Sequence, residues 1–409
     1  MNYDKFFISL HFHYLPIFII RRIALSIPSE SFIIPKIMKN ALKIFAVLLA
    51  AVSFNSGFAQ SSEKSPLIHA IYSLEREWPA PEAVAAPELD AFDFVYIMAA
   101  PKWTASDFDL SQEEINEKYV NGHEYRHPEG MKAFIDAVHG QGGKILCSFP
   151  GTEFIEIAPD SARADKFAVM MAEFAAKYGY DGIEVDWEHT VTEELHLDFM
   201  KRIRRELSRK AGDDGRDWLT TALHSYRQYT PEMAAELSAC VDWINIMFYD
   251  MGGGIWGTVP THNSPLDAMD RDYRKYWPMF DPAKLHIGMP NYGFYYRGIR
   301  PGEKAEEGKT LRDYGRYCDY TELAPLMQSG WTEVWDEQAQ CPYYFSADGT
   351  EFMTLESPRS LDAKLKWVED NGFGGIFWWE YSCDWIKPAV SGTRGQHLLV
   401  DHVTSKIKK

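Results

Sequence analysis

Short apolar runs alternate with longer amphipathic stretches along most of the chain. The runs are rich in β-branched and aromatic residues and are bounded by Gly, Pro, Asp or Asn, which is typical of buried parallel strands. Eight of them are predicted as strands, at residues 68–74, 92–99, 144–149, 180–187, 218–223, 241–249, 285–290 and 374–379. Between them, apolar residues recur with helical spacing, as at 128–139, 161–178, 192–210 and 360–371. This alternation predicts an α/β fold, a (β/α)8 TIM barrel.

The interval between the seventh and eighth predicted strands is too long for one helix and two loops. Within it, the short aromatic runs 331–335 and 342–345 are bounded by Gly and charged residues. We therefore predict a small α+β insertion domain over 294–356, inside a TIM-barrel catalytic domain over 66–400.

The N-terminal segment has the pattern of a leader. Lys43 precedes an apolar run at 44–52, and small residues precede a candidate cleavage site after Ala59. This pattern predicts a secretory signal peptide over 38–59, and the run is too short to span a bilayer. We interpret residues 1–37 as an over-extended gene start, with a tandem leader as the alternative. The predicted location is secreted or periplasmic.

Charge narrows the possible partners. The formal net charge is −17, and it becomes −21 when residues 1–59, with six Lys or Arg and two Asp or Glu, are left out. Nucleic acid and anionic membranes are therefore poor partners. A neutral polysaccharide is compatible with this charge, because sugars stack on aromatic rings and form hydrogen bonds. The chain has 13 Trp and 14% aromatic residues. Most of these rings are nevertheless expected in the core.

The cysteines do not suggest a metal site. None of the five is spaced as in a CxxC motif: Cys147, Cys240, Cys318, Cys341 and Cys383. An exported protein can form disulfides, and Cys318 with Cys341 is the most plausible pair because both fall in the predicted insertion. Cys147 and Cys240 are expected to be buried thiols. No metal and no cofactor is predicted.

Three carboxylates occupy alternate positions at the end of the fourth predicted strand: Glu184, Asp186 and Glu188. Side chains alternate in a strand, so the three acids share one face and the apolar residues between them share the other. Neighbouring acids are then roughly 7 Å apart and repel each other. If that face is buried, at least one proton stays on, which is how a general acid is made at neutral pH. The alternative is a solvated acidic edge strand.

The spacing Asp181-x-x-Glu184-x-Asp186-x-Glu188 resembles the DxxDxDxE signature of glycoside hydrolase family 18, the chitinases and their relatives. One position departs from it, because Glu184 stands where the family has Asp. The resemblance implies that Glu188 protonates the glycosidic oxygen and that Asp186 orients the acetamido group of the sugar. Glu184, Ser148 and Tyr72 would hold the proton that Asp186 alternately shares. Such enzymes use the substrate's own acetamido oxygen as the nucleophile.

Two other strand ends carry matching motifs. Residues 247–250 resemble the family's M-x-Y-D, in which Tyr249 would bind the acetamido carbonyl and Asp250 the same sugar. Met247 belongs to the same motif. Residues 374–379 resemble the motif of strand eight, whose last Trp forms the floor under the cleaved sugar. Trp379 is the candidate and Trp378 the competitor, since alternation turns only one of them inward.

Weaker resemblances add further substrate-binding candidates: Ser148, Tyr72, Tyr292 and Trp256. Ser148 matches the start of the family's S-x-G-G, but Pro150 replaces the first Gly. Tyr292 lies in a P-x-Y-G-like segment, Tyr72 near the end of the first predicted strand and Trp256 in a Gly-rich loop. Each alone is equally well explained by barrel packing.

Together these motifs imply retaining, substrate-assisted hydrolysis of β-1,4-linked N-acetylglucosamine polymers or oligomers. The expected partner is a glycan containing N-acetylglucosamine, with no nucleic acid and no integral membrane span. One alternative is an endo-β-N-acetylglucosaminidase acting on N-glycans or peptidoglycan. Another is a non-catalytic chitin-binding lectin, which the intact Glu188 disfavours.

Overall fold

The computed structural model describes residues 67–79, 87–151, 153–211, 217–389 and 394–407. The predicted over-extended start and the predicted signal peptide, residues 1–59, lie outside the described residues. Among the helices within the described ranges, none has the length and apolar character needed to cross a membrane.

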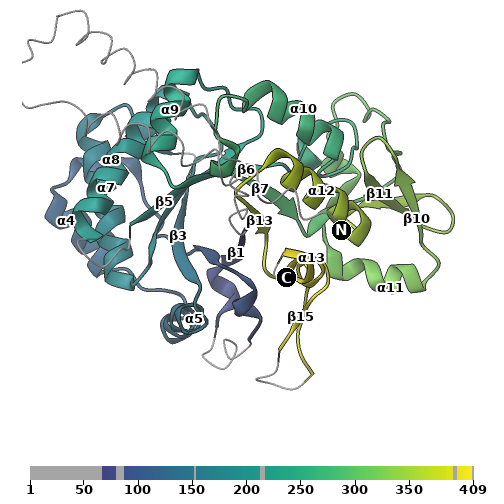
Figure 1. The fold of residues 1–409 in the computed structure, drawn as a ribbon, viewed down its shortest axis with the longest axis horizontal. Helices are drawn as coiled ribbons and strands as arrows, with labels where there is room; N and C mark the ends of the chain where they lie inside the picture. The colour runs from purple at the N-terminus through teal and green to yellow at the C-terminus, as the bar shows by residue number, and fades with distance from the viewer. Residues whose placement is uncertain (1–66, 80–86, 152, 212–216, 390–393, 408–409) are drawn as a thin grey trace, which may run out of the picture. The chain divides into compact units, whose positions relative to one another are not determined.

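Eight parallel strands close into a barrel in which the first strand pairs with the last (Figure 1). They are β1 (Ile68–Leu74), β2 (Phe94–Met98), β3 (Lys144–Pro150), β4 (Gly182–Asp186), β5 (Trp218–His224), β6 (Trp243–Met247), β7 (Leu285–Pro290) and β13 (Gly375–Trp379). All eight lie where the apolar runs predict them, with ends shifted by at most two residues. The TIM-barrel prediction is therefore confirmed.

Helices follow the strands and cover the outside of the barrel. The longer ones are α5 (Pro128–Gly140), α7 (Ser161–Tyr178), α8 (Glu193–Ala211), α9 (Pro231–Cys240), α10 (Leu266–Tyr276), α12 (Pro358–Asn371) and α13 (Val400–Ile407). A short helix, α4 (Gln112–Asn116), precedes α5. Local sequence sets the ends of α7: the Asp160 side chain caps its first amide groups, and Gly179 ends it with a left-handed φ of 81°.

Strand β4 shows how alternation separates the core from the site. Ile183, Val185 and Trp187 are fully buried in the apolar layer shared with the helices. Glu184 and Asp186 point the other way, to the inside of the barrel, and are also buried. The strand therefore carries its acids on the inner face, and the solvated edge-strand interpretation is wrong.

A second, antiparallel sheet lies between β7 and β13 in the sequence. Its strand order is β10-β11-β12-β8-β9. The strands are β8 (Tyr292–Arg297), β9 (Gly315–Asp319), β10 (Thr332–Asp336), β11 (Cys341–Phe345) and β12 (Glu351–Thr354), with α11 (Leu323–Gln328) between β9 and β10. Separate apolar clusters form on this sheet, one around Phe294 and Phe352 and another around Trp331 and Met353.

The expected Cys318–Cys341 disulfide is wrong. All five cysteines lie in the described part of the chain, and each is a free, buried thiol. Cys318 is on β9 and Cys341 on β11, and two strands separate these strands in the sheet. Three strand spacings amount to about 14 Å, whereas a disulfide needs Cα atoms within about 7 Å.

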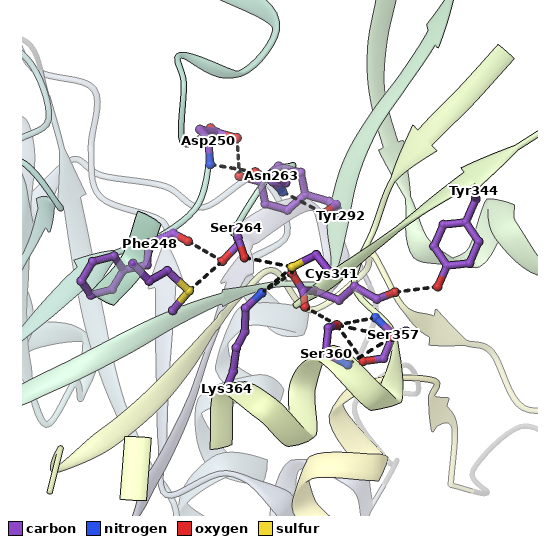
Figure 2. Close-up of polar contacts among 12 residues, drawn as sticks. Phe248, Asp250, Asn263, Ser264, Tyr292, Cys341, Tyr344, Ser357, Ser360 and Lys364 are labelled. Atoms are coloured by element: carbon purple, nitrogen blue, oxygen red, sulfur yellow. Dashed lines mark hydrogen bonds and ion pairs between the residues drawn. The ribbon is translucent and has the colours of Figure 1, made fainter. Parts of the chain in front are cut away.

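A buried ion pair joins α12 to the small sheet. Lys364 and Glu356 have exposed fractions of 0% and 3%, and the Lys364 ammonium contacts the Glu356 carboxylate. Ser360 Oγ donates to the same carboxylate at 2.6 Å, and Cys341 Sγ lies 3.8 Å from Lys364 Nζ. Figure 2 shows these side chains converging from the helix and the strand. Glu356 lies just before α12, and the contacts of both charged groups with Cys341 Sγ link the pair to β11.

Candidate active site

Two adjoining cavities open at the C-terminal ends of the barrel strands, with volumes of about 480 and 680 Å³. Tyr72, Asp186 and Trp379 line the first, and Tyr226 and Trp256 line the second. Six residues line both: Glu188, His224, Met247, Tyr249, Asp250 and Tyr317. The cavities are thus two halves of one groove, and Glu188 lies at their junction.

The three acids of β4 become more exposed toward the groove. Glu184 is completely buried, Asp186 retains 4% exposure, and the Glu188 side chain is 40% exposed. This gradient follows from their positions, because Glu188 stands beyond the last residue of the strand. Only Glu188 and Asp186 line the groove, and Glu184 supports them from below.

Glu184 is held by two donors from neighbouring strands. The hydroxyl of Tyr72 donates to Glu184 Oε1, and Asn245 Nδ2 donates to the same oxygen at 2.7 Å. Glu184 Oε2 has no hydrogen-bond partner among the described residues. Burial raises the pKa of Glu184 to about 7, while the Tyr72 and Asn245 hydrogen bonds oppose the rise. Glu184 can therefore change its charge near neutral pH.

Burial is also the main cause of the raised pKa values of the other two acids, Asp186 and Glu188. It raises the pKa of Asp186 well above its usual range, and the nearby charges of Glu188 and Glu184 add to the rise. Burial raises the pKa of Glu188, and His189 opposes this rise. The row of acids therefore retains protons at a pH where free carboxyl groups have lost them, as a general acid requires.

Asp250 is fixed by a ring of three hydrogen bonds (Figure 2). Tyr292 OH donates to Asp250 Oδ1 at 2.7 Å, and the Asp250 N–H donates to Asn263 Oδ1 at 2.7 Å. Asn263 Nδ2 closes the ring by donating to the Tyr292 carbonyl at 3.0 Å. The φ of Asp250 is +52°, a backbone conformation that residues other than Gly rarely adopt. Burial raises its pKa to about 6, and the Tyr292 hydrogen bond opposes this.

The two candidate tryptophans of β13 face opposite sides. Trp379 lines the first cavity, with its ring centre 5.4 Å from that of Tyr72. Trp378 is completely buried in the outer core, where its Nε1 hydrogen-bonds His69 Nε2 at 2.8 Å. Trp256 is 61% exposed beside the second cavity, and the Arg312 guanidinium covers one ring face at 4.1 Å. Among the described tryptophans, Trp379 and Trp256 are therefore the two that line the groove.

Nearly all residues singled out in the sequence meet at this groove. They are Glu188, Asp186, Tyr249, Asp250, Met247, Trp379, Tyr72, Tyr292 and Trp256. Ser148 does not line either cavity. It is buried as the Cα neighbour of Glu184, and its Oγ has no hydrogen-bond partner within the described ranges.

Residues of the site that the sequence did not predict include Asn245, His224, Tyr226 and Tyr317. Asn245 and His224 could have been noticed as polar residues on otherwise apolar strands. Tyr226 and Tyr317 lie on a loop and on the small sheet, and no local pattern distinguishes them from other exposed aromatics. Among the described side chains, no three of His, Cys, Asp or Glu are grouped so that they could hold a metal ion.

A TIM barrel with a row of carboxylates at the end of its fourth strand is typical of glycoside hydrolases. The chain belongs to glycosyl hydrolases family 18, whose family model matches residues 83–384.

Several known proteins are similar to this chain. It is 26% identical over 272 residues to chitinase A1 of Niallia circulans, covering 56% of this chain and 38% of that protein. It is 28% identical over 269 residues to an endochitinase of Manduca sexta, covering 56% and 47%. The match thus spans less than half the length of these relatives. A solved chitinase from Bacillus thuringiensis shares the fold with a TM-score of 0.65 at 17% identity, over 84% of this chain and 70% of that one.

Proposed function

We propose that the chain hydrolyses β-1,4-linked N-acetylglucosamine polymers or oligomers, the chitin class of glycan, with retention of configuration. One observation carries this proposal. Glu188 lies where the two halves of the groove meet, at the end of a row of buried acids whose pKa values are raised. A sugar chain lying along the groove would place one glycosidic oxygen beside this carboxyl group.

The position of the acids favours a substrate-assisted mechanism. Asp186 and Glu188 stand on the same side of the groove, two residues apart, so they cannot flank a sugar on opposite faces as the acid and nucleophile of ordinary retaining glycosidases do. Glu188 donates its proton to the glycosidic oxygen while the acetamido oxygen attacks the anomeric carbon. Asp186 orients the acetamido N–H and stabilises the resulting oxazolinium ion. Glu188 then takes a proton from the water that opens the ring.

The other groove residues hold the reacting sugar in this scheme. Tyr249 donates to the acetamido carbonyl, Asp250 binds the same sugar, and Trp379 provides the floor. Trp256 provides a stacking surface beyond the cleaved bond. Glu184, hydrogen-bonded by Tyr72, is the partner with which Asp186 shares its proton.

The proposal extends to domain organisation and location. Residues 294–356 would act as an inserted domain that deepens the groove, which is supported by Tyr317 of β9 lining both cavities. A deep groove suits a linear chain. The leader-like pattern over 38–59 supports export to the periplasm or the medium, where such glycans occur.

A side-by-side hydrolysis assay tests the function. The protein should cleave chitotetraose faster than it releases N-glycans from a glycoprotein or fragments from peptidoglycan. Faster cleavage of either of the latter would instead indicate the endo-β-N-acetylglucosaminidase alternative. Binding of chitotetraose without cleavage would indicate a lectin. Glu188→Gln serves as the matched inactive control.

A further inference from the structure

His224 ends β5 and lines both halves of the groove. Its Nε2 lies 3.6 Å from Glu188 Oε2, slightly too far for a hydrogen bond. This Nε2 is buried and has no hydrogen-bond partner among the described residues. A buried polar atom without a partner is costly. The cost is removed if Nε2 gains a partner during the reaction.

The orientation of the His224 ring is fixed by its neighbours. The Tyr226 ring stacks on it with centres 5.1 Å apart and an interplanar angle of 13°. His189, next to Glu188, lies 5.9 Å away on a ring-centre basis. In the sheet, His224 pairs with Met247 of β6, another groove residue. Nε2 therefore stays directed at the Glu188 carboxyl group.

His224 is held in its neutral form at neutral pH. Burial lowers the pKa of His224 to about 4, and the nearby Arg227 and His189 side chains lower it further. Ionisable groups around it include Glu188, His189, Arg227 and the stacked Tyr226. A neutral imidazole has one N–H donor and one acceptor nitrogen, so it can donate to a carboxylate without bringing a positive charge beside the acid.

The same loop also holds the backbone of the acid. Arg227 NH2 donates to the Glu188 carbonyl at 2.5 Å, and NH1 donates to the Val191 carbonyl at 3.3 Å. The segment 224–227 therefore contacts the main chain of Glu188 and faces its side chain. One segment thus holds the main chain of Glu188 and places His224 beside its half-exposed side chain.

We propose that His224 is a positioning residue for the general acid, and that its Nε2–H donates a hydrogen bond to Glu188 Oε2 as this carboxyl group gives up its proton. The inference rests on the proposed function. The Glu188 proton moves to the glycosidic oxygen, and the C1–O bond breaks with its electron pair going to that oxygen. The new carboxylate accepts the His224 hydrogen bond. His224 stays neutral, and Glu188 recovers its proton from water in the second step.

A pair of variants separates the hydrogen bond from the shape of the ring. His224→Phe keeps the stacking on Tyr226 but removes the donor, whereas the amide of His224→Gln puts an N–H near the position of Nε2. Both are compared on chitotetraose, whose leaving sugar needs a proton, and on 4-nitrophenyl chitobioside, whose leaving group needs little help. The value measured is kcat/KM, which reports the first chemical step.

We expect His224→Phe to lower kcat/KM on chitotetraose between about ten- and a hundred-fold, the usual range for a lost hydrogen bond to a charged group. The loss on the nitrophenyl substrate should be less than about three-fold, because little protonation is needed there. His224→Gln should restore most of the activity on chitotetraose. Should the Phe variant fail to fold, His224→Asn repeats the test, since its shorter amide takes the place of Nδ1.

Other results would overturn the inference. Equal losses of kcat/KM on both substrates would indicate that His224 contacts the sugar. Weaker chitotriose binding, with the same ratio of kcat/KM between the two substrates as in the wild type, would indicate the same. Trp256→Ala is the reference for that behaviour. Unchanged kinetics in His224→Phe would remove any role. If the wild type cleaves none of the N-acetylglucosamine substrates, the proposed function itself fails, which is distinct from a failure of the His224 assignment.

Discussion

Replacing Glu184 by Gln keeps the shape of the side chain and removes the charge that Glu184 carries above its pKa of about 7. The Gln carbonyl can still accept from Tyr72 and Asn245, which both donate to Oε1 in the wild type. Glu184 and Asp186 are two residues apart on β4, or about 7 Å. At an effective dielectric constant of about 20, their charges repel by about 2.4 kcal/mol. This repulsion is one of the causes that raise the pKa of Asp186, after burial and the charge of Glu188.

The sign follows from the repulsion. Without the charge of Glu184, Asp186 ionises more easily, so its pKa falls. The limb of the pH–rate profile that Asp186 controls should therefore move about 1 to 2 units toward lower pH. If the whole repulsion of about 2.4 kcal/mol is added to the activation free energy, the rate at neutral pH should fall by up to about 50-fold. The assay is kcat/KM on a chito-oligosaccharide over roughly pH 4 to 9.

Two controls make this prediction sharp. Glu184→Asp keeps the charge and introduces the residue usual in the family, so it should remain active with a nearly unchanged profile. The wild type should lose stability as pH rises from 4.5 to about 7, because folding holds the Glu184 pKa above its ordinary value. Glu184→Gln should lose less stability than the wild type over this range, because the other buried acids still contribute their share. If the Gln variant has the wild-type rate and profile, Glu184 is a packing residue and shares no proton with Asp186.

Four further results are expected. Glu188→Gln should abolish hydrolysis and keep oligosaccharide binding by calorimetry; because general acids contribute roughly 10²–10⁴-fold, residual turnover above about a hundredth would refute the assignment. A thiazoline analogue of N-acetylglucosamine should inhibit competitively, and early NMR spectra should show the β-anomer; the α-anomer would mean an inverting enzyme. Burial and then Glu380 raise the pKa of Glu77 from 4.5 to about 8, so wild-type melting temperatures should decline between these pH values and those of Glu77→Gln should decline less; parallel curves would contradict this. Lys364→Met should cost about 3–5 kcal/mol in urea unfolding by leaving Glu356 unpaired, and adding Glu356→Met should recover most of it; a single-variant loss below about 1 kcal/mol would contradict the buried pair.

Local pattern was sufficient for the elements and for the row of acids. Whether a side chain points to one face of a strand or the other depends on its position along a few consecutive residues. The shared face of Glu184, Asp186 and Glu188 could therefore be predicted from the sequence, as could the strand ends. The same rule said that only one of Trp378 and Trp379 faces the groove.

Contacts between distant strands could not be predicted in this way. Which tryptophan of β13 faces inward depends on how that strand pairs with β1 and β7 in the closed barrel. Proximity in the sequence suggested a Cys318–Cys341 bond, but the order of strands in the small sheet keeps these thiols apart. Asn245 reaches Glu184, from 61 residues further along the chain, only because β6 and β4 both face the barrel interior.

The sequence by itself thus determined the barrel, its strands and the acids on one face of β4, because these depend on periodicity within single segments. Only the tertiary structure decided that Glu188 meets His224 at the junction of the groove, and that Tyr317 of the small sheet lines it. Those distances are set by barrel closure and by the packing of an inserted sheet, which no single segment encodes.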